Sequence, residues 1–274
     1  MKRIVVIAAM FAMVMAPLFA GGRGEEAGAA QAAPFVIEVG GSTSVVPVLE
    51  LLANAFHAEN PNIRINIHST GSSDGIRNAG SLYQLGMTSR DLTPAELGMG
   101  LNQQLVAIDG IAVILHPSSP VSDLTVDQIR GIYMGQITNW NQIPGSNKSG
   151  SIVVITREEG SGTRGAFEEM VGFAGQLYAG AIEGPSTGAV RTNVAGNVNA
   201  IGYISTGSIT PEVRAISVGG VEPTTANMIA GDYGIARPFI LLYTSLHPAS
   251  RQFLDWATGS AGQAIVARSW VPIN

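Results

Sequence analysis

The feature that most constrains the fold is a three-part segment that occurs three times: a short apolar strand, a cluster of Gly, Ser and Thr residues, and then a helical pattern. In the first copy, the strand Phe35–Val39 leads into Gly40–Ser44, and apolar residues then recur at the spacing of one buried helical face. These residues are Val45, Val48, Leu49, Leu52 and Phe56. Because strands alternate with helices, the pattern predicts an α/β fold with largely parallel sheets.

The other two copies keep the same order. In the second, the alternating strand Ile63–Ile67 is followed by the polar run Ser69–Gly75 and a short helix from Ile76. In the third, the strand Ser151–Ile155 is followed by Thr156–Thr163 and a helix with an apolar stripe at Phe167, Met170, Val171 and Ala174. Further strands are predicted at 110–115, 200–204 and 238–243, and capping boxes at Thr93 with Glu96 and at Thr125 with Gln128.

The clusters of Gly, Ser and Thr have the chemistry of an oxyanion site. A helix N-terminus exposes unpaired backbone N–H groups and the positive end of the helix dipole, glycine lets the backbone approach a ligand closely, and hydroxyls add donors. One such loop is better explained as a helix cap, but three of them can converge on one small anion. Arg157 precedes Ser161 by four residues and offers a planar fork suited to phosphate. The alternative for Arg157 is a surface salt bridge with Glu158 or Glu159.

Composition excludes several classes of function. The formal net charge is −5, so the chain lacks the basic excess of a nucleic-acid-binding protein. The sequence contains no cysteine, which excludes thiol catalysis and cysteine-based metal sites. No cofactor or metal site is expected.

The N-terminus has the pattern of an export signal. Lys2 and Arg3 precede the apolar run Ile4–Ala20, which predicts a signal peptide over residues 1–20 and a flexible linker over residues 21–34. Because no cysteine follows the signal, the expectation is a protein that is free in the periplasm and not lipid-anchored.

The motifs together resemble the phosphate-binding proteins of bacterial ABC transporters. They are GGSTSVVP (40–47), STGSSDGI (69–76), LGMTSRDL (85–92), DGIAVILHPSSPVSDLT (109–125), GQITNW (135–140), TREEGSGTRGAFEE (156–169) and AIGYIS (200–205). The resemblance implies a type II periplasmic binding fold: two α/β lobes, each a mixed sheet flanked by helices, with the ligand in the cleft between them. Lobe 1 is expected over residues 35–112 and 206–274, and lobe 2 over residues 113–205; the strands at 200–204 and 238–243 both remain candidates for the return crossover.

The resemblance also implies the role of the protein and its site residues. A monomer would bind inorganic phosphate, perform no catalysis and deliver the anion to the permease subunits of an ABC transporter. The expected phosphate-binding residues are Thr43, Ser44, Ser72, Ser89, Arg90, Arg157, Ser161, Gly162 and Thr163.

One position departs from part of this family, in which a carboxylate accepts the proton of bound phosphate. Ser89 stands at that position, so the acceptor would be Asp91 or a hydroxyl, and Arg90 would add positive charge.

Four alternatives remain open. Sulfate, molybdate or tungstate would fit the same fold, and a phosphate sensor or scavenger would need no transporter. The run Gly71–Gly75 matches the nucleophile elbow of hydrolases, with His116 or His247 as the base. The run Gly160–Gly165 matches a dinucleotide fingerprint, with Glu183 near the distance for a ribose contact.

Overall fold

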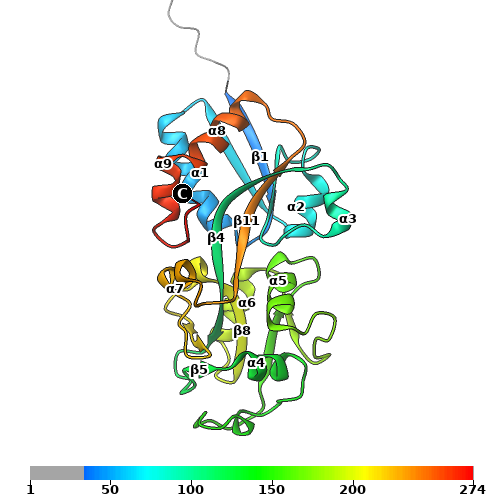
Figure 1. Cartoon of the computed structure of the whole chain (residues 1–274), viewed down its shortest axis with the longest axis vertical. Coiled ribbons are helices and arrows are strands. Elements are labelled where there is room, and N and C mark those ends of the chain that lie inside the picture. Colours follow the sequence, from blue (N-terminus) through cyan, green and yellow to red (C-terminus); the bar gives the residue numbers. More distant parts are fainter. Residues whose placement is uncertain (1–33, 274) are drawn as a thin grey trace, which may run out of the picture. The chain divides into compact units, whose positions relative to one another are not determined.

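The computed structural model of the protein describes residues 34–273, which fold into two lobes joined by long strands (Figure 1). The predicted signal peptide, and the predicted linker except for Pro34, lie outside the described residues. Across residues 34–273, no helix combines the length and the apolar character that crossing a membrane requires.

Lobe 1 is built from the N-terminal elements and the C-terminal elements of the described range. In chain order they are β1 (Phe35–Gly41), α1 (Val46–Glu59), β2 (Ile63–Ser69), α2 (Ser72–Asn78), β3 (Leu85–Thr88), α3 (Pro94–Leu97), the first part of β4 (Asn102–Leu115), β11 (Ala236–Tyr243), α8 (Pro248–Thr258) and α9 (Ser260–Val266). All five apolar residues predicted for the first helical face are buried around α1.

Lobe 2 contains the elements between the two crossings. They are the second part of β4, β5 (Asp123–Leu124), α4 (Val126–Tyr133), the 3-10 turn η1 (Trp140–Gln142), β6 (Val153–Arg157), α5 (Gly162–Val171), β7 (Ile182–Gly184), α6 (Thr187–Ala195), β8 (Ala200–Ser205), η2 (Thr206–Ser208), β9 (Arg214–Ala215), β10 (Ser217–Val218) and α7 (Thr225–Ala230). Both predicted capping boxes are present, at the starts of α3 and α4.

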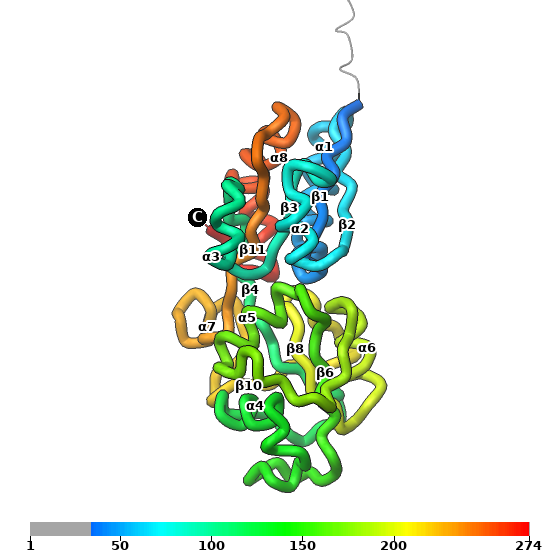
Figure 2. Tube along the Cα trace, turned by 90° about the vertical axis from the view of Figure 1, so that its right-hand side faces the viewer, coloured from blue at the N-terminus to red at the C-terminus, as the bar shows by residue number. Residues whose placement is uncertain are grey.

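The strands of both lobes hydrogen-bond in the order β2-β1-β3-β11-β4-β8-β6-β7. The outer pairs, β1 with β2 and β6 with β7, are parallel, whereas β11 and β4 are antiparallel to their neighbours. The arrangement is therefore mixed rather than largely parallel. The long strand β4 pairs with β11 through residues 102–110 and with β8 through residues 111–115, so it passes from one lobe into the other (Figures 1 and 2).

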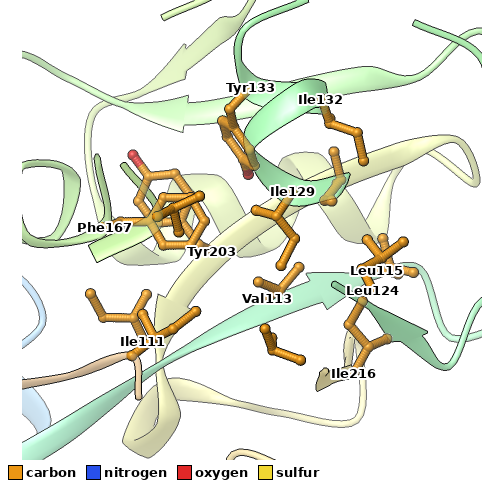
Figure 3. Close-up of a cluster of buried hydrophobic side chains, with 14 of the residues drawn as sticks. Ile111, Val113, Leu115, Leu124, Ile129, Ile132, Tyr133, Phe167, Tyr203 and Ile216 are labelled. Carbon is orange, nitrogen blue, oxygen red and sulfur yellow. The ribbon is translucent and has the colours of Figure 1, made fainter. Parts of the chain in front are cut away.

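Each lobe has its own apolar core. In lobe 1, α1 and α8 cover β1, β3 and β11. In lobe 2, Ile111, Val113 and Leu115 on β4 face an aromatic group formed by Tyr133, Phe167 and others (Figure 3). The rings of Phe167 and Tyr203 stack with centroids 4.0 Å apart in this core. Burial of such rings fixes α5, whose first residue faces lobe 1.

The segment between β8 and β11 packs with lobe 2. Ile216, Tyr233 and Ile235 belong to the buried cluster that contains Ile111, and the Ile111 N–H donates to the Ile235 carbonyl at 2.8 Å. We therefore propose that lobe 2 extends from about residue 110 to residue 235, which differs from the expected range of 113–205. The physical reason is that β9 adds to the edge of β4 and β10 pairs with β5, so the return crossing is β11.

Candidate anion-binding site between the lobes

The starts of α1, α2, α5 and α6 meet where the two lobes touch, and their hydroxyl side chains are buried there. At the end of β1, Gly41 has a φ of 139°, and a Cβ at this position would lie 2.1 Å from the Met87 carbonyl oxygen. The Gly41 carbonyl accepts hydrogen bonds from the N–H groups of Thr70 and Gly71 at 2.8 and 2.7 Å. The first loop is thereby tied to the second, which places both loops on one side of lobe 1.

The lobe 1 hydroxyls form a connected network. Ser42 Oγ donates to Ser89 Oγ at 2.8 Å and lies 3.0 Å from Ser44 Oγ. The Ser89 N–H donates to Ser72 Oγ at 3.2 Å. Ser44, Ser72 and Ser89 are completely buried. Three residues predicted from separate motifs are therefore brought together, with Ser42 joining them.

Lobe 2 completes the network from the opposite side. Thr163 Oγ1, at the start of α5, lies 3.2 Å from Ser44 Oγ. Thr43 Oγ1 lies 3.0 Å from Thr187 Oγ1 and accepts from the Thr187 N–H at 3.2 Å. Thr187 is the first residue of α6, so this helix also begins at the site.

Gly162 and Ser161 hold the start of α5 against lobe 1. Ser161 is the N-cap of α5 and accepts from the Arg164 N–H at 3.3 Å. A Cβ on Gly162 would lie 2.2 Å from Ser72 Oγ and 2.7 Å from Ser89 Oγ, so only glycine permits this approach of the lobes. The Ser73 N–H donates across the same junction to the Gly160 carbonyl at 3.1 Å.

Arg157 is buried at the edge of this network, with 2% of its side chain exposed. Its Nε and Nη2 both donate to the Glu158 carboxylate at 2.7 Å, and its Nη1 donates to Thr187 Oγ1 at 3.2 Å. The predicted alternative of a pair with Glu158 is therefore present, but the pair is buried on the arginine side. One edge of the guanidinium is held by the carboxylate while Nη1 contacts the hydroxyl cluster.

Arg90 lies apart from the hydroxyl cluster. Its Nη1 and Nη2 donate to the two oxygens of Glu96 at 2.7 and 2.8 Å, and Nη1 also donates to the Asp91 carbonyl at 2.8 Å. The hydrogen bonds from Arg90, together with those from Thr93, lower the pKa of Glu96 to about 2. The Arg90 side chain lines a cavity of about 600 Å³ at the junction of the lobes, and the Asp91 side chain is exposed there.

Sequence reasoning missed Ser42, Thr187 and a buried ion pair. Arg237 Nη2 lies 3.1 Å from Asp109 Oδ2, and both side chains are completely buried. Burial raises the pKa of Asp109 and lowers the pKa of Arg237 to about 10, and in each case the charge of the partner opposes the shift. The ion pair had one signal in the sequence, which is the single arginine inside the apolar strand ARPFILLY. A buried charge requires a partner, so this arginine indicated a buried carboxylate elsewhere in the chain.

The side chains that the hydrolase and dinucleotide motifs would require make contacts that do not belong to such sites. His116 Nδ1 hydrogen-bonds with Ser118 Oγ, and His247 caps α8 and stacks on Phe35. Glu183 pairs with Arg164 at 2.9 Å. Within the part of the chain that the structure describes, no group of three or more His, Cys, Asp or Glu side chains is arranged to hold a metal ion.

Comparisons with known proteins give one consistent family. A family profile described as a PBP superfamily domain matches residues 24–261. The phosphate-binding protein PstS of Borreliella burgdorferi is 28% identical over 245 residues, which cover 84% of this chain and 87% of that protein. A phosphate-bound structure of a putative phosphate ABC transporter substrate-binding protein from Clostridium perfringens is 42% identical, with a TM-score of 0.84 and coverage of 87% of this chain and 100% of that one. The ABC-type phosphate transport receptor of Vibrio cholerae is 32% identical, with a TM-score of 0.71 and coverage of 86% and 99%.

Proposed function

Because this chain belongs to the phosphate ABC transporter substrate-binding proteins of the PBP superfamily, we propose that it captures inorganic phosphate between its lobes and delivers it to the permease of an ABC transporter. The protein acts outside the cytoplasm, free in the periplasm and as a monomer. It performs no catalysis: the anion enters and leaves unchanged.

The observation that carries this proposal is the buried network in which hydroxyls and helix starts from both lobes meet in one small region beside Arg157. Hydrogen bonds that involve a charged partner contribute about 1.5–3 kcal/mol each. A micromolar dissociation constant requires about 8 kcal/mol net. Six or more donors therefore offset dehydration of the anion and leave enough free energy for that affinity.

The proposed ligands come from both lobes. Lobe 1 contributes Thr43, Ser44, Ser72 and Ser89; lobe 2 contributes Arg157, Ser161, Gly162 and Thr163. Arg90 acts at the cavity of about 600 Å³ that it lines, outside the hydroxyl network, because its ion pair with Glu96 holds its guanidinium there. With donors on both lobes, the anion makes its full set of contacts only when the lobes meet, so binding favours the closed arrangement.

A second candidate keeps the fold and changes the anion to sulfate, molybdate or tungstate. The observation that favours it is that position 89 holds a serine and not a carboxylate. The Ser89 hydroxyl contacts the hydroxyls of Ser42 and Ser72, its backbone N–H donates to Ser72 Oγ, and its carbonyl accepts from Arg237. A carboxylate accepts the proton of hydrogen phosphate and repels a fully deprotonated anion, whereas a hydroxyl adapts to either.

The test is isothermal titration calorimetry of the ligand-free protein with phosphate, sulfate, molybdate and tungstate at several pH values. Micromolar or tighter binding of phosphate, with the other anions at least 100-fold weaker, is the expected result. Tight binding of sulfate or a metal oxyanion without phosphate binding would assign the second candidate. Binding of none of the four would overturn both.

A further inference from the structure

An ion pair joins the two strands that cross between the lobes. Arg237 on β11 is the direct cross-strand neighbour of Asp109 on β4, and these strands run side by side through the crossing (Figure 1). The neighbouring residues, Gly110 and Ala236, are also paired. The pair therefore lies where β4 and β11 cross between the lobes, at residues 109–110 and 236–237, a segment that we call the hinge. Both side chains of the pair are completely buried.

Asp109 connects the hinge to lobe 2 with its second oxygen. Its Oδ1 accepts from Ser205 Oγ at 2.8 Å and from Thr206 Oγ1 at 3.1 Å, at the end of β8. The carboxylate thus has three donors, one from β11 and two from lobe 2. This full set of partners fixes the orientation of the Arg237 guanidinium.

Arg237 reaches the hydroxyl network from this anchor. Its Nη1 donates to the Ser89 carbonyl at 3.1 Å, in lobe 1, and to Thr163 Oγ1 at 2.8 Å, in lobe 2. The contact with the Ser89 carbonyl stays within lobe 1, and the contact with Asp109 joins the two crossing strands. The contact with Thr163 spans the two lobes, so it exists only while the lobes are together. Among the described residues, Arg237 Nε is buried without a hydrogen-bond partner.

We propose that Arg237 is a second arginine of the anion site, anchored by Asp109, and that it couples the bound anion to closure of the hinge. The proposal deepens the proposed function and rests on it. The guanidinium touches two of the proposed ligand residues, and its free Nε–H is a donor that an anion oxygen satisfies. The charge of Arg157 also acts on Arg237, and an anion between the two arginines relieves this repulsion.

The test uses variants that keep the buried charges balanced. Arg237→Gln alone leaves Asp109 buried without its counter-ion and risks unfolding. The double variant Asp109→Asn with Arg237→Gln removes both charges and retains hydrogen-bonding groups of similar shape. Arg251→Gln, on the exposed face of α8, is the control for an arginine-to-glutamine substitution outside the site.

Three measurements are made on each variant: the phosphate dissociation constant by calorimetry, the phosphate-induced change in radius of gyration by small-angle X-ray scattering, and the thermal midpoint without phosphate. For the double variant, we expect phosphate binding about 10- to 100-fold weaker, as for the loss of one charge-assisted hydrogen bond. We also expect a smaller phosphate-induced compaction, and a folded protein without ligand. Arg251→Gln should match the wild type.

The outcomes separate this inference from the proposed function. Wild-type protein that fails to bind phosphate overturns the proposed function itself. Wild-type protein that binds phosphate, together with a double variant within threefold of its affinity and with full compaction, overturns the role of Arg237. A lower thermal midpoint with unchanged affinity assigns the ion pair to fold stability and also overturns the proposal.

Discussion

Replacing Gly162 by alanine tests whether contact between the lobes is what binds the anion. The added Cβ would lie 2.2 Å from Ser72 Oγ and 2.9 Å from Ser72 Cβ, so rotation of the serine side chain does not relieve the clash. Ordinary contact begins at about 3.4 Å, so the lobes must separate by roughly 1 Å at this point. Alanine is favourable in the first turn of α5, and the folded lobes should therefore keep their stability.

The separation breaks the hydrogen bonds that cross the cleft. The bond from Arg237 to Thr163 is 2.8 Å long, and the contacts Ser44–Thr163 and Thr43–Thr187 are 3.2 and 3.0 Å. Stretched by roughly 1 Å, none remains a hydrogen bond. With about 1 kcal/mol for each neutral contact and about 1.5–3 kcal/mol for the charged one, closure loses about 3.5–5 kcal/mol. Phosphate affinity should fall roughly 300- to 4,000-fold.

The assay is calorimetric titration with phosphate, together with thermal unfolding of the ligand-free protein. Gly165→Ala is the matched control, because it lies in the same helix and its Cβ would make only an ordinary contact, 3.4 Å from Arg90 Cδ. We expect weak binding by Gly162→Ala, near wild-type binding by Gly165→Ala, and no loss of thermal stability in either. Equal affinities for the two variants would refute the reasoning that close approach of α5 to lobe 1 forms the site.

Three further substitutions test other parts of the structure. Arg157→Ala should weaken phosphate binding by about 2–5 kcal/mol in calorimetry and leave the protein folded, since Glu158 is partly exposed; unchanged affinity would remove Arg157 from the site. Glu96→Gln removes a carboxylate whose pKa is lowered to about 2 by Arg90, so it should reduce stability above pH 4.5, and the deficit should vanish as the pH falls toward 2. Denaturant unfolding at several pH values measures this, and a pH-independent deficit would contradict it. Thr125→Ala deletes the cap of α4 and should cost about 0.5–2 kcal/mol of unfolding free energy without changing affinity.

Features governed by short-range rules were predictable from the sequence. These features depend on residues that are close together in the sequence. They are the helical face of α1, the capping boxes of α3 and α4, and the strands β1, β2 and β8. The third predicted stripe was less accurate at its end. Met170 is exposed at the end of α5, and Gly172, with a φ of 83°, terminates the helix. Ala174 therefore lies exposed beyond the helix, and Phe173 enters the core instead.

Features that depend on distant pairing were not predictable in the same way. Arg237 and Asp109 are 128 residues apart, and only the antiparallel register of β11 with β4 makes them neighbours. Arg90 shows the opposite case. The Thr93 capping box already fixes Glu96 close by, so a local partner holds Arg90 outside the hydroxyl network.

The balance of charge at the proposed site bears on how an acidic protein would hold an anion there. Glu158 pairs with Arg157 and Asp109 pairs with Arg237, so the two ion pairs as wholes add no net charge, although each guanidinium still presents N–H donors. Attraction must then come from N–H and O–H groups aimed at one point, which act at short range and depend on geometry. A site of this kind gains little from the overall field of the protein. Phosphate affinity should therefore vary weakly with salt concentration, whereas any change that alters the approach of the lobes should alter it strongly.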